Sequence, residues 1–130
     1  MENEFEKLKQ EFEEQNGWGL LSSIDLHFCN HDFIIEEDKL KEFAISLCEN
    51  IKMKRFGEPS VIRFGEGGTA GLSVIQLIET SNIIAHFVDD TDAGFLDIFS
   101  CKFYNPKEVA EFAKQFFQAK DYKLTYLIRK

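Results

Sequence analysis

Hydrophobic residues recur along the chain with two different periods, which separate helical from extended segments. In three segments they recur every three to four positions, as is typical of amphipathic helices. These segments cover 2–16, 37–53 and a stretch that begins at Asn105-Pro106. Asparagine is a good N-cap and proline is tolerated at the first helical position, so Asn105-Pro106 predicts a helix start. Asn16-Gly17 predicts the end of the first helix, because both residues tolerate left-handed backbone.

Strand signals fill most of the remaining chain. The strands that we expect, with apolar residues alternating or in short runs, are 19–28, 60–64, 72–79, 82–88, 95–101 and about 122–128. The acidic, glycine-ended segment 89–94 has the composition of a turn. After the first helix, the order is strand, helix, four strands, helix and strand.

Consecutive strands favour an antiparallel sheet with the helices packed on one face. We therefore expect an α+β fold, a two-layer α/β sandwich with a mostly antiparallel sheet. Residues 1–130 are interpreted as a single domain. Within it, 1–17 form an N-terminal helical extension and 18–130 form the domain proper.

The composition fits a globular domain and argues against several classes of function. The chain has 130 residues, 44% of them hydrophobic, and a formal net charge of −8. This charge argues against a nucleic-acid partner, which needs a basic face, and against an anionic membrane surface. No apolar run approaches the ~20 residues of a membrane span, and the acidic start is unlike a signal peptide. We expect a cytoplasmic protein that favours a small cationic ligand.

The cysteine and glycine patterns give no sign of a metal or phosphate site. Cys29, Cys48 and Cys101 include no CxxC pair, and the three histidines form no zinc-type cluster. The glycine-rich segment 65–71 lacks the Lys-Ser/Thr of a phosphate-binding loop and precedes a strand. It is interpreted as a turn, or as a loop whose backbone passes close to a ligand.

The segment 79–101 holds the residues with the most chemical potential. Ser81, His86 and Cys101 are individually common residue types, but His86 follows Ser81 by five positions and Cys101 follows it by twenty. These spacings resemble the bacterial and archaeal S-adenosylmethionine decarboxylase family, in which a Glu-Ser-His segment is followed by histidine and by Asp-hydrophobic-Phe-Thr-Cys at the same offsets. The latter reads Asp97-Ile98-Phe99-Ser100-Cys101 in this chain.

Two upstream segments extend the resemblance to about residues 20–129. Arg63-Phe64, followed by Gly68 and Gly71, is similar to the family's glycine-spaced loop. The segment 24–29 is similar to its first strand, an Asp-hydrophobic-aromatic-x-Cys pattern.

The resemblance implies a self-processing decarboxylase with a covalent pyruvoyl cofactor. Ser81 would attack the carbonyl of Thr80, cut the chain between residues 80 and 81, and become the pyruvoyl group. His86 matches the residue that assists the elimination, for which an imidazole is a suitable base at neutral pH. The pyruvoyl carbonyl would form a Schiff base with the substrate amine and accept electrons as CO2 leaves. Cys101 matches the proton donor. Such enzymes act in polyamine biosynthesis, commonly as homodimers of the processed protomer.

The resemblance also identifies a substrate pocket that departs from the family pattern. Phe64 matches an aromatic residue that stacks on adenine, whereas Val88 replaces a second aromatic residue. Asp90 replaces a glutamate that binds the ribose, and Glu66, Asp89 and Asp90 would place carboxylates near the mouth. Carboxylates suit the distal cation of arginine or ornithine. We therefore expect one of these substrates slightly in preference to S-adenosylmethionine.

Three further departures bear on processing. Thr80 and Asn82 replace the residues that flank the cleavage serine in the family, and Ala70 stands where a serine that assists processing is expected, with Thr69 beside it. They leave open an alternative in which the chain stays uncut and acts as a non-catalytic partner of an active homologue.

Overall fold

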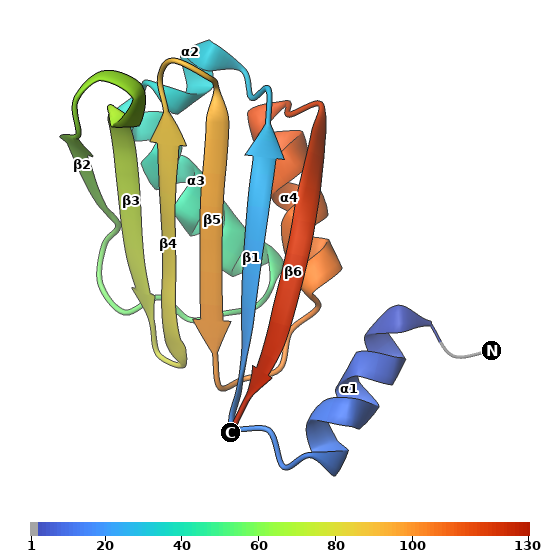
Figure 1. Ribbon diagram of the computed structural model, residues 1–130. Coiled ribbons are helices and arrows are strands. Elements are labelled where there is room, and N and C mark those ends of the chain that lie inside the picture. The colour runs from blue at the N-terminus through green and yellow to red at the C-terminus, as the bar shows by residue number, and fades with distance from the viewer. Residues whose placement is uncertain (1–2) are drawn as a thin grey trace.

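A single six-stranded sheet organises the computed structural model, which describes residues 3–130. The strands lie in the order β2-β3-β4-β5-β1-β6, and every neighbouring pair is antiparallel (Figure 1). The strands are β1 (Gly19–His27), β2 (Ser60–Phe64), β3 (Gly71–Ile78), β4 (Ser81–Val88), β5 (Ala93–Ser100) and β6 (Asp121–Arg129). The helices are α1 (Glu4–Glu14), α2 (His31–Ile34), α3 (Glu37–Asn50) and α4 (Pro106–Phe117), with a 3-10 turn η1 (Gly67–Thr69).

The core lies between one face of the sheet and helices α3 and α4 (Figure 1). Side chains alternate between the two faces of a strand, so every second residue of the central strands enters this core. Its centre is aromatic, because Phe43 of α3 and Phe87 of β4 each pack against Phe117 of α4, with ring centroids 4.7 and 4.6 Å apart. This confirms the expected two-layer α+β sandwich with helices on one face of the sheet.

The opposite face of the sheet is not covered by any helix of residues 3–130 and exposes large apolar side chains. We call it the open face. Strand alternation and register place there Ile62, Phe64, Leu77, Ile84, Phe95 and Leu127, each of which is exposed. Large apolar side chains gathered on one exposed face are typical of sites where proteins associate.

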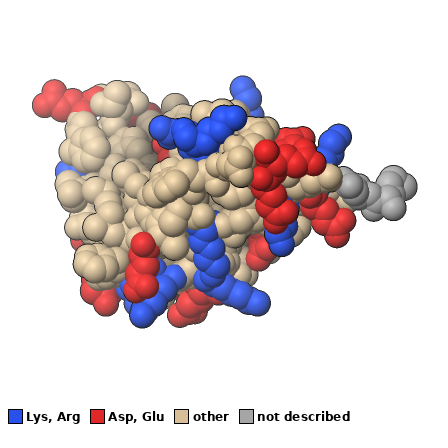
Figure 2. Space-filling view, turned by 90° about the horizontal axis from the view of Figure 1, so that it is seen from below, with Lys and Arg blue, Asp and Glu red and all other residues tan. Residues whose placement is uncertain are grey.

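Helix α1 lies outside the two-layer body and contacts it through its apolar stripe. Phe5 and Phe12 pack on Phe103, with ring centroids 5.5 and 5.3 Å apart, and Leu8 is buried. Seen from below, the surface carries acidic and basic side chains intermixed, with uncharged residues between them (Figure 2). The predicted extension is therefore helical from Glu4 to Glu14; residue 2, the predicted first residue of this helix, lies outside the described residues.

Most expected element boundaries are correct within one to three residues. The predicted cap at Asn105 is confirmed, since its side chain accepts a hydrogen bond from the Lys107 amide at 3.1 Å. Five predicted C-terminal ends, at residues 16, 28, 53, 79 and 101, were one to three residues too long. The helix predicted to reach residue 53 ends at Asn50, and the strand predicted to reach Cys101 ends at Ser100. The short helix α2 was not expected. Within residues 3–130, no helix combines the length and the apolar character that a membrane span requires.

Candidate functional site

The chemically distinctive residues lie in two groups at opposite ends of β4. Ser81 is the first residue of this strand, and His86 is the sixth. Strands rise by about 3.4 Å per residue, so the two Cα atoms lie about 17 Å apart. The structure therefore does not bring Ser81 and His86 of one chain together.

The first group surrounds the peptide bond between Thr80 and Ser81. Strands β3 and β4 form a hairpin through the two-residue turn Glu79-Thr80, which fixes Ser81 opposite Ile78 and Ser100. The backbone N–H of Cys101 donates a hydrogen bond to the carbonyl oxygen of Thr80 at 3.0 Å. A donor in this position polarises the carbonyl and stabilises negative charge that develops on its oxygen.

Cys101 lies beside this peptide and is exposed. It follows the last residue of β5, whereas the sequence predicted it inside the strand. The other two cysteines have a different character. Burial raises the pKa of Cys29 to about 12 and that of Cys48 to about 11, so both remain protonated thiols at neutral pH. Cys101 is therefore the exposed thiol of the three.

The second group surrounds His86. The Ser73 hydroxyl lies 2.7 Å from His86 Nδ1, and the carbonyl oxygen of Thr69 lies 2.9 Å from Nε2. Because a carbonyl only accepts, Nε2 carries the proton in the neutral ring and Nδ1 accepts from Ser73. The ring of Phe64 lies beside the imidazole, with centroids 5.3 Å apart. His86 is thus held in one orientation and one tautomer.

Ser73 is the residue that sequence reasoning missed. The serine expected to assist processing was placed at Ala70, with Thr69 as a substitute, but Thr69 contacts His86 only through its backbone carbonyl. The two-residue turn at 79–80 could have identified Ser73 from the sequence. In an antiparallel hairpin the residue numbers of every pair add up to the same value. The pairing of Ile78 with Ser81 across this turn therefore requires the pairing of Ser73 with His86, as the register shows.

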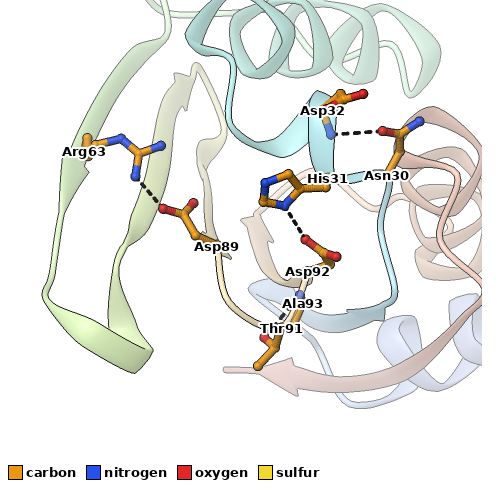
Figure 3. A network of polar contacts seen from close by, with 8 residues as sticks. All are labelled: Asn30, His31, Asp32, Arg63, Asp89, Thr91, Asp92 and Ala93. Atoms are coloured by element: carbon orange, nitrogen blue, oxygen red, sulfur yellow. Dashed lines mark hydrogen bonds and ion pairs between the residues drawn. The ribbon is translucent and has the colours of Figure 1, made fainter.

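The acidic residues predicted to line the pocket are partly occupied by basic neighbours (Figure 3). Asp89 Oδ2 forms an ion pair with Arg63 at 2.6 Å, and its other oxygen is buried without a hydrogen-bond partner among residues 3–130. Asp92 pairs with His31 at 2.7 Å. Glu66 caps η1 through its backbone, which exchanges hydrogen bonds with Thr69. Asp90 is exposed in the same turn as Asp89.

Candidate metal ligands do not gather in the part of the chain that the structure describes. No three His, Cys, Asp or Glu side chains of residues 3–130 come close enough together to hold a metal ion.

A protein-family model described as S-adenosylmethionine decarboxylase matches residues 21–130. The chain belongs to the S-adenosylmethionine decarboxylase family. This family consists of pyruvoyl-dependent decarboxylases. The match begins after α1, so the helical extension is an addition to the region that the family shares.

The fold agrees with a solved structure of the same family. The chain superposes on the adenosylmethionine decarboxylase from Aquifex aeolicus VF5 with a TM-score of 0.73 and 16% sequence identity, over 87% of this chain and 91% of that one. At this identity the similarity establishes the fold. No curated protein matches the sequence.

Proposed function

We propose that this member of the S-adenosylmethionine decarboxylase family cuts itself between Thr80 and Ser81 and then decarboxylates a cationic α-amino acid. The observation that carries the proposal is the hydrogen bond from Cys101 N–H to the Thr80 carbonyl. It places a fixed donor on the peptide bond to be cut, directly before a serine and beside an exposed thiol.

The first step of self-cleavage uses Ser81 alone as nucleophile. Its Oγ adds to the carbonyl carbon of Thr80, the C–N bond breaks, and the amide becomes an ester with a free amine on Ser81. Negative charge develops on the Thr80 carbonyl oxygen in this step, where the Cys101 N–H stabilises it. A base then removes the Cα proton of Ser81, the Cβ–O bond breaks, and the Thr80 carboxylate leaves. Hydrolysis of the resulting dehydroalanine releases ammonia and leaves the pyruvoyl group.

The base for the elimination comes from a second copy of the chain. His86 and Ser73 form a hydrogen-bonded pair, but they lie about 17 Å from Ser81 along β4. A two-fold axis between two open faces, perpendicular to the strands, would set the Ser81 end of one protomer against the His86 end of the other. Each dimer would then contain two equivalent sites.

The open face supports this homodimer. It exposes six large apolar side chains from Ile62 to Leu127 on five of the six strands, and a covered face would remove them from water. Phe64 is one of these side chains and also contacts His86, so the same association would bring both residues to the partner's Ser81.

Turnover would use the pyruvoyl group together with Cys101. When formed, this group captures the substrate amine and accepts the electron pair that CO2 leaves behind. Cys101, whose backbone N–H binds the Thr80 carbonyl and whose side chain is exposed, would return a proton to the substrate carbon.

Two classes of substrate are candidates for the pocket, and both are α-amino acids whose side chain carries a positive charge. Exposed Phe64 offers a ring face for the adenine or sulfonium of S-adenosylmethionine. Asp90 and the loss of an aromatic side chain at Val88 support arginine or ornithine, whose decarboxylation would supply polyamine synthesis. The pairing of Asp89 with Arg63 removes one carboxylate from the argument for these basic amino acids.

Intact mass spectrometry of the freshly purified protein tests the proposal. We expect fragments 1–80 and 81–130, the second beginning with a pyruvoyl group that borohydride reduces. Ser81→Ala should remain a single chain, and Cys101→Ala should be cut but should turn over slowly. Release of CO2 from S-adenosylmethionine, arginine and ornithine then identifies the substrate. A wild-type chain that stays whole, with no reducible carbonyl, would instead support a non-catalytic partner role.

A further inference from the structure

We infer that the hydroxyl of Ser100 is a positioning residue for self-cleavage and that it acts by holding Thr80. This inference rests on the proposed function. It concerns the side chains of positions 80 and 100, which neither the fold nor the family membership assigns to a role.

The two hydroxyls form part of a continuous chain of hydrogen bonds. The Lys102 amide donates to Ser100 Oγ at 3.0 Å, and Ser100 Oγ donates to Thr80 Oγ1 at 2.8 Å. Thr80 Oγ1 in turn lies 3.6 Å from Met53 Sδ, within reach of a donated hydrogen bond. Each donor in such a chain strengthens the next, so the side chain of Thr80 is oriented by groups on two other segments, 100–102 and Met53.

Ser100 is fully buried beside the peptide bond to be cut. It is 0% exposed, at the last position of β5, and it pairs in register with Ser81. A buried hydroxyl without partners is costly, and Thr80 and the Lys102 amide satisfy this one.

Thr80 is consequently held at two points, one on each side of its Cα atom. Ser100 fixes its side chain, and the Cys101 amide fixes its carbonyl oxygen. Both contacts come from two adjacent residues, Ser100 and Cys101. The β-branched threonine is also stiff at χ1, so a hydrogen bond to its hydroxyl restricts how far its Cα atom can move. The carbonyl carbon that Ser81 attacks is therefore presented in one orientation.

This positioning matters because the attack is intramolecular and very sensitive to geometry. A displacement of about 1 Å can slow such a reaction by about a hundredfold. Removing the Ser100 hydroxyl leaves Thr80 held by the Cys101 amide alone, so its peptide plane is less firmly oriented. We expect Ser100→Ala to slow the conversion of amide to ester by between about tenfold and a hundredfold.

The test measures the rate of cutting in freshly refolded wild type, Ser100→Ala and Thr80→Val, the last of which keeps the shape of threonine without its hydroxyl. Both variants should be slow, and the double variant should be no slower than either single one, because the pair acts as a unit. Thr80→Ser, which keeps the hydroxyl, should restore most of the rate. Ser22→Ala is the matched control, since Ser22 is equally buried but bonds to Tyr104 instead.

Hydroxylamine, which cleaves esters, separates a positioning role from a general loss of structure. It should speed the cutting of His86→Ala, in which the ester forms and waits for elimination. It should not speed the cutting of Ser100→Ala, in which the ester forms slowly. Ser100→Ala cut at the wild-type rate would overturn the inference and leave the proposed function standing. A wild-type chain that never cuts would overturn both.

Discussion

Ser73 and His86 face each other across strands β3 and β4 with the hydroxyl 2.7 Å from Nδ1, at the far end of β4 from Ser81. The Ser73 hydroxyl is satisfied by this contact, and the opposite ring nitrogen is bound by a backbone carbonyl. A histidine held so firmly cannot cross about five strand residues, roughly 17 Å, to reach the Ser81 of its own chain. If it takes part in cutting, it does so in another copy.

Mixing two inactive variants distinguishes a His86 that acts on its own chain from one that acts on a partner chain. A Ser81→Ala chain has its histidine but nothing to cut, and a His86→Ala chain has its serine but lacks the base. When the two are produced together with different tags, we expect the His86→Ala chain to be cut wherever it is paired with a Ser81→Ala chain. Intact mass spectrometry of the separated tags measures this. If His86 acts within its own chain, neither variant will be cut.

Two controls accompany this experiment. Each variant produced alone should stay whole, apart from slow background cutting of His86→Ala. A His27→Gln chain should be cut normally by itself, because His27 lies at the end of β1, on the far side of β5 from the candidate site.

The fold followed from the sequence because its signals are local. The N-cap at Asn105, the turn before β5 and the strand alternation each depend on a few adjacent residues. The site could be predicted only in part, because it depends on which strands pair. The contact of Ser73 with His86 follows from the register of β3 and β4. The ion pair that occupies Asp89 forms because β2 brings Arg63 beside it. Ser81 and His86 lie five positions apart on one extended strand, and this extension keeps them apart in space although they are close in sequence.

Gly71 tests how closely β3 and β4 must approach near Ser73. A methyl group added at Gly71 would overlap the backbone carbonyl of Phe87, which cannot move without distorting β4. We expect Gly71→Ala to lower the free energy of unfolding by about 3 kcal/mol. Urea denaturation measures the loss. Gly68→Ala is the control, because no atom lies within 4 Å of the added methyl group, and its effect should stay within about 0.5 kcal/mol.

His31 gives the stability a pH dependence of known sign. Its hydrogen bond to Asp92 raises the pKa of the imidazole above its usual value of about 6.5, with a smaller contribution from nearby carboxylates. A raised pKa means that the folded state binds the proton more tightly. The stabilisation is therefore complete below about pH 6.5 and is lost as the pH rises through the higher folded-state pKa.

Urea denaturation across this pH range checks the assignment. His31→Gln should remove the corresponding part of the pH dependence. Asp92→Asn should do the same, because asparagine tolerates the left-handed backbone that Asp92 adopts at φ 60°. Added salt should weaken the effect in the wild type, since the pair is exposed. An unchanged slope in both variants would assign the pH dependence to other groups.

Arg63 governs whether Asp89 is available to a substrate. The ion pair at 2.6 Å occupies one carboxylate oxygen, so Arg63→Met would free it. Guanidinium and ammonium groups donate hydrogen bonds to a carboxylate, whereas a sulfonium cannot. We therefore expect Arg63→Met to raise kcat/KM for arginine or ornithine several-fold relative to S-adenosylmethionine. The unfolding free energy should change by less than about 1 kcal/mol, because the pair is partly exposed. Arg55→Met, which breaks an ion pair with Glu58 elsewhere, is the matched control. If the ratio of kcat/KM for arginine or ornithine to that for S-adenosylmethionine changes equally in both variants, or in neither, Asp89 does not face the substrate.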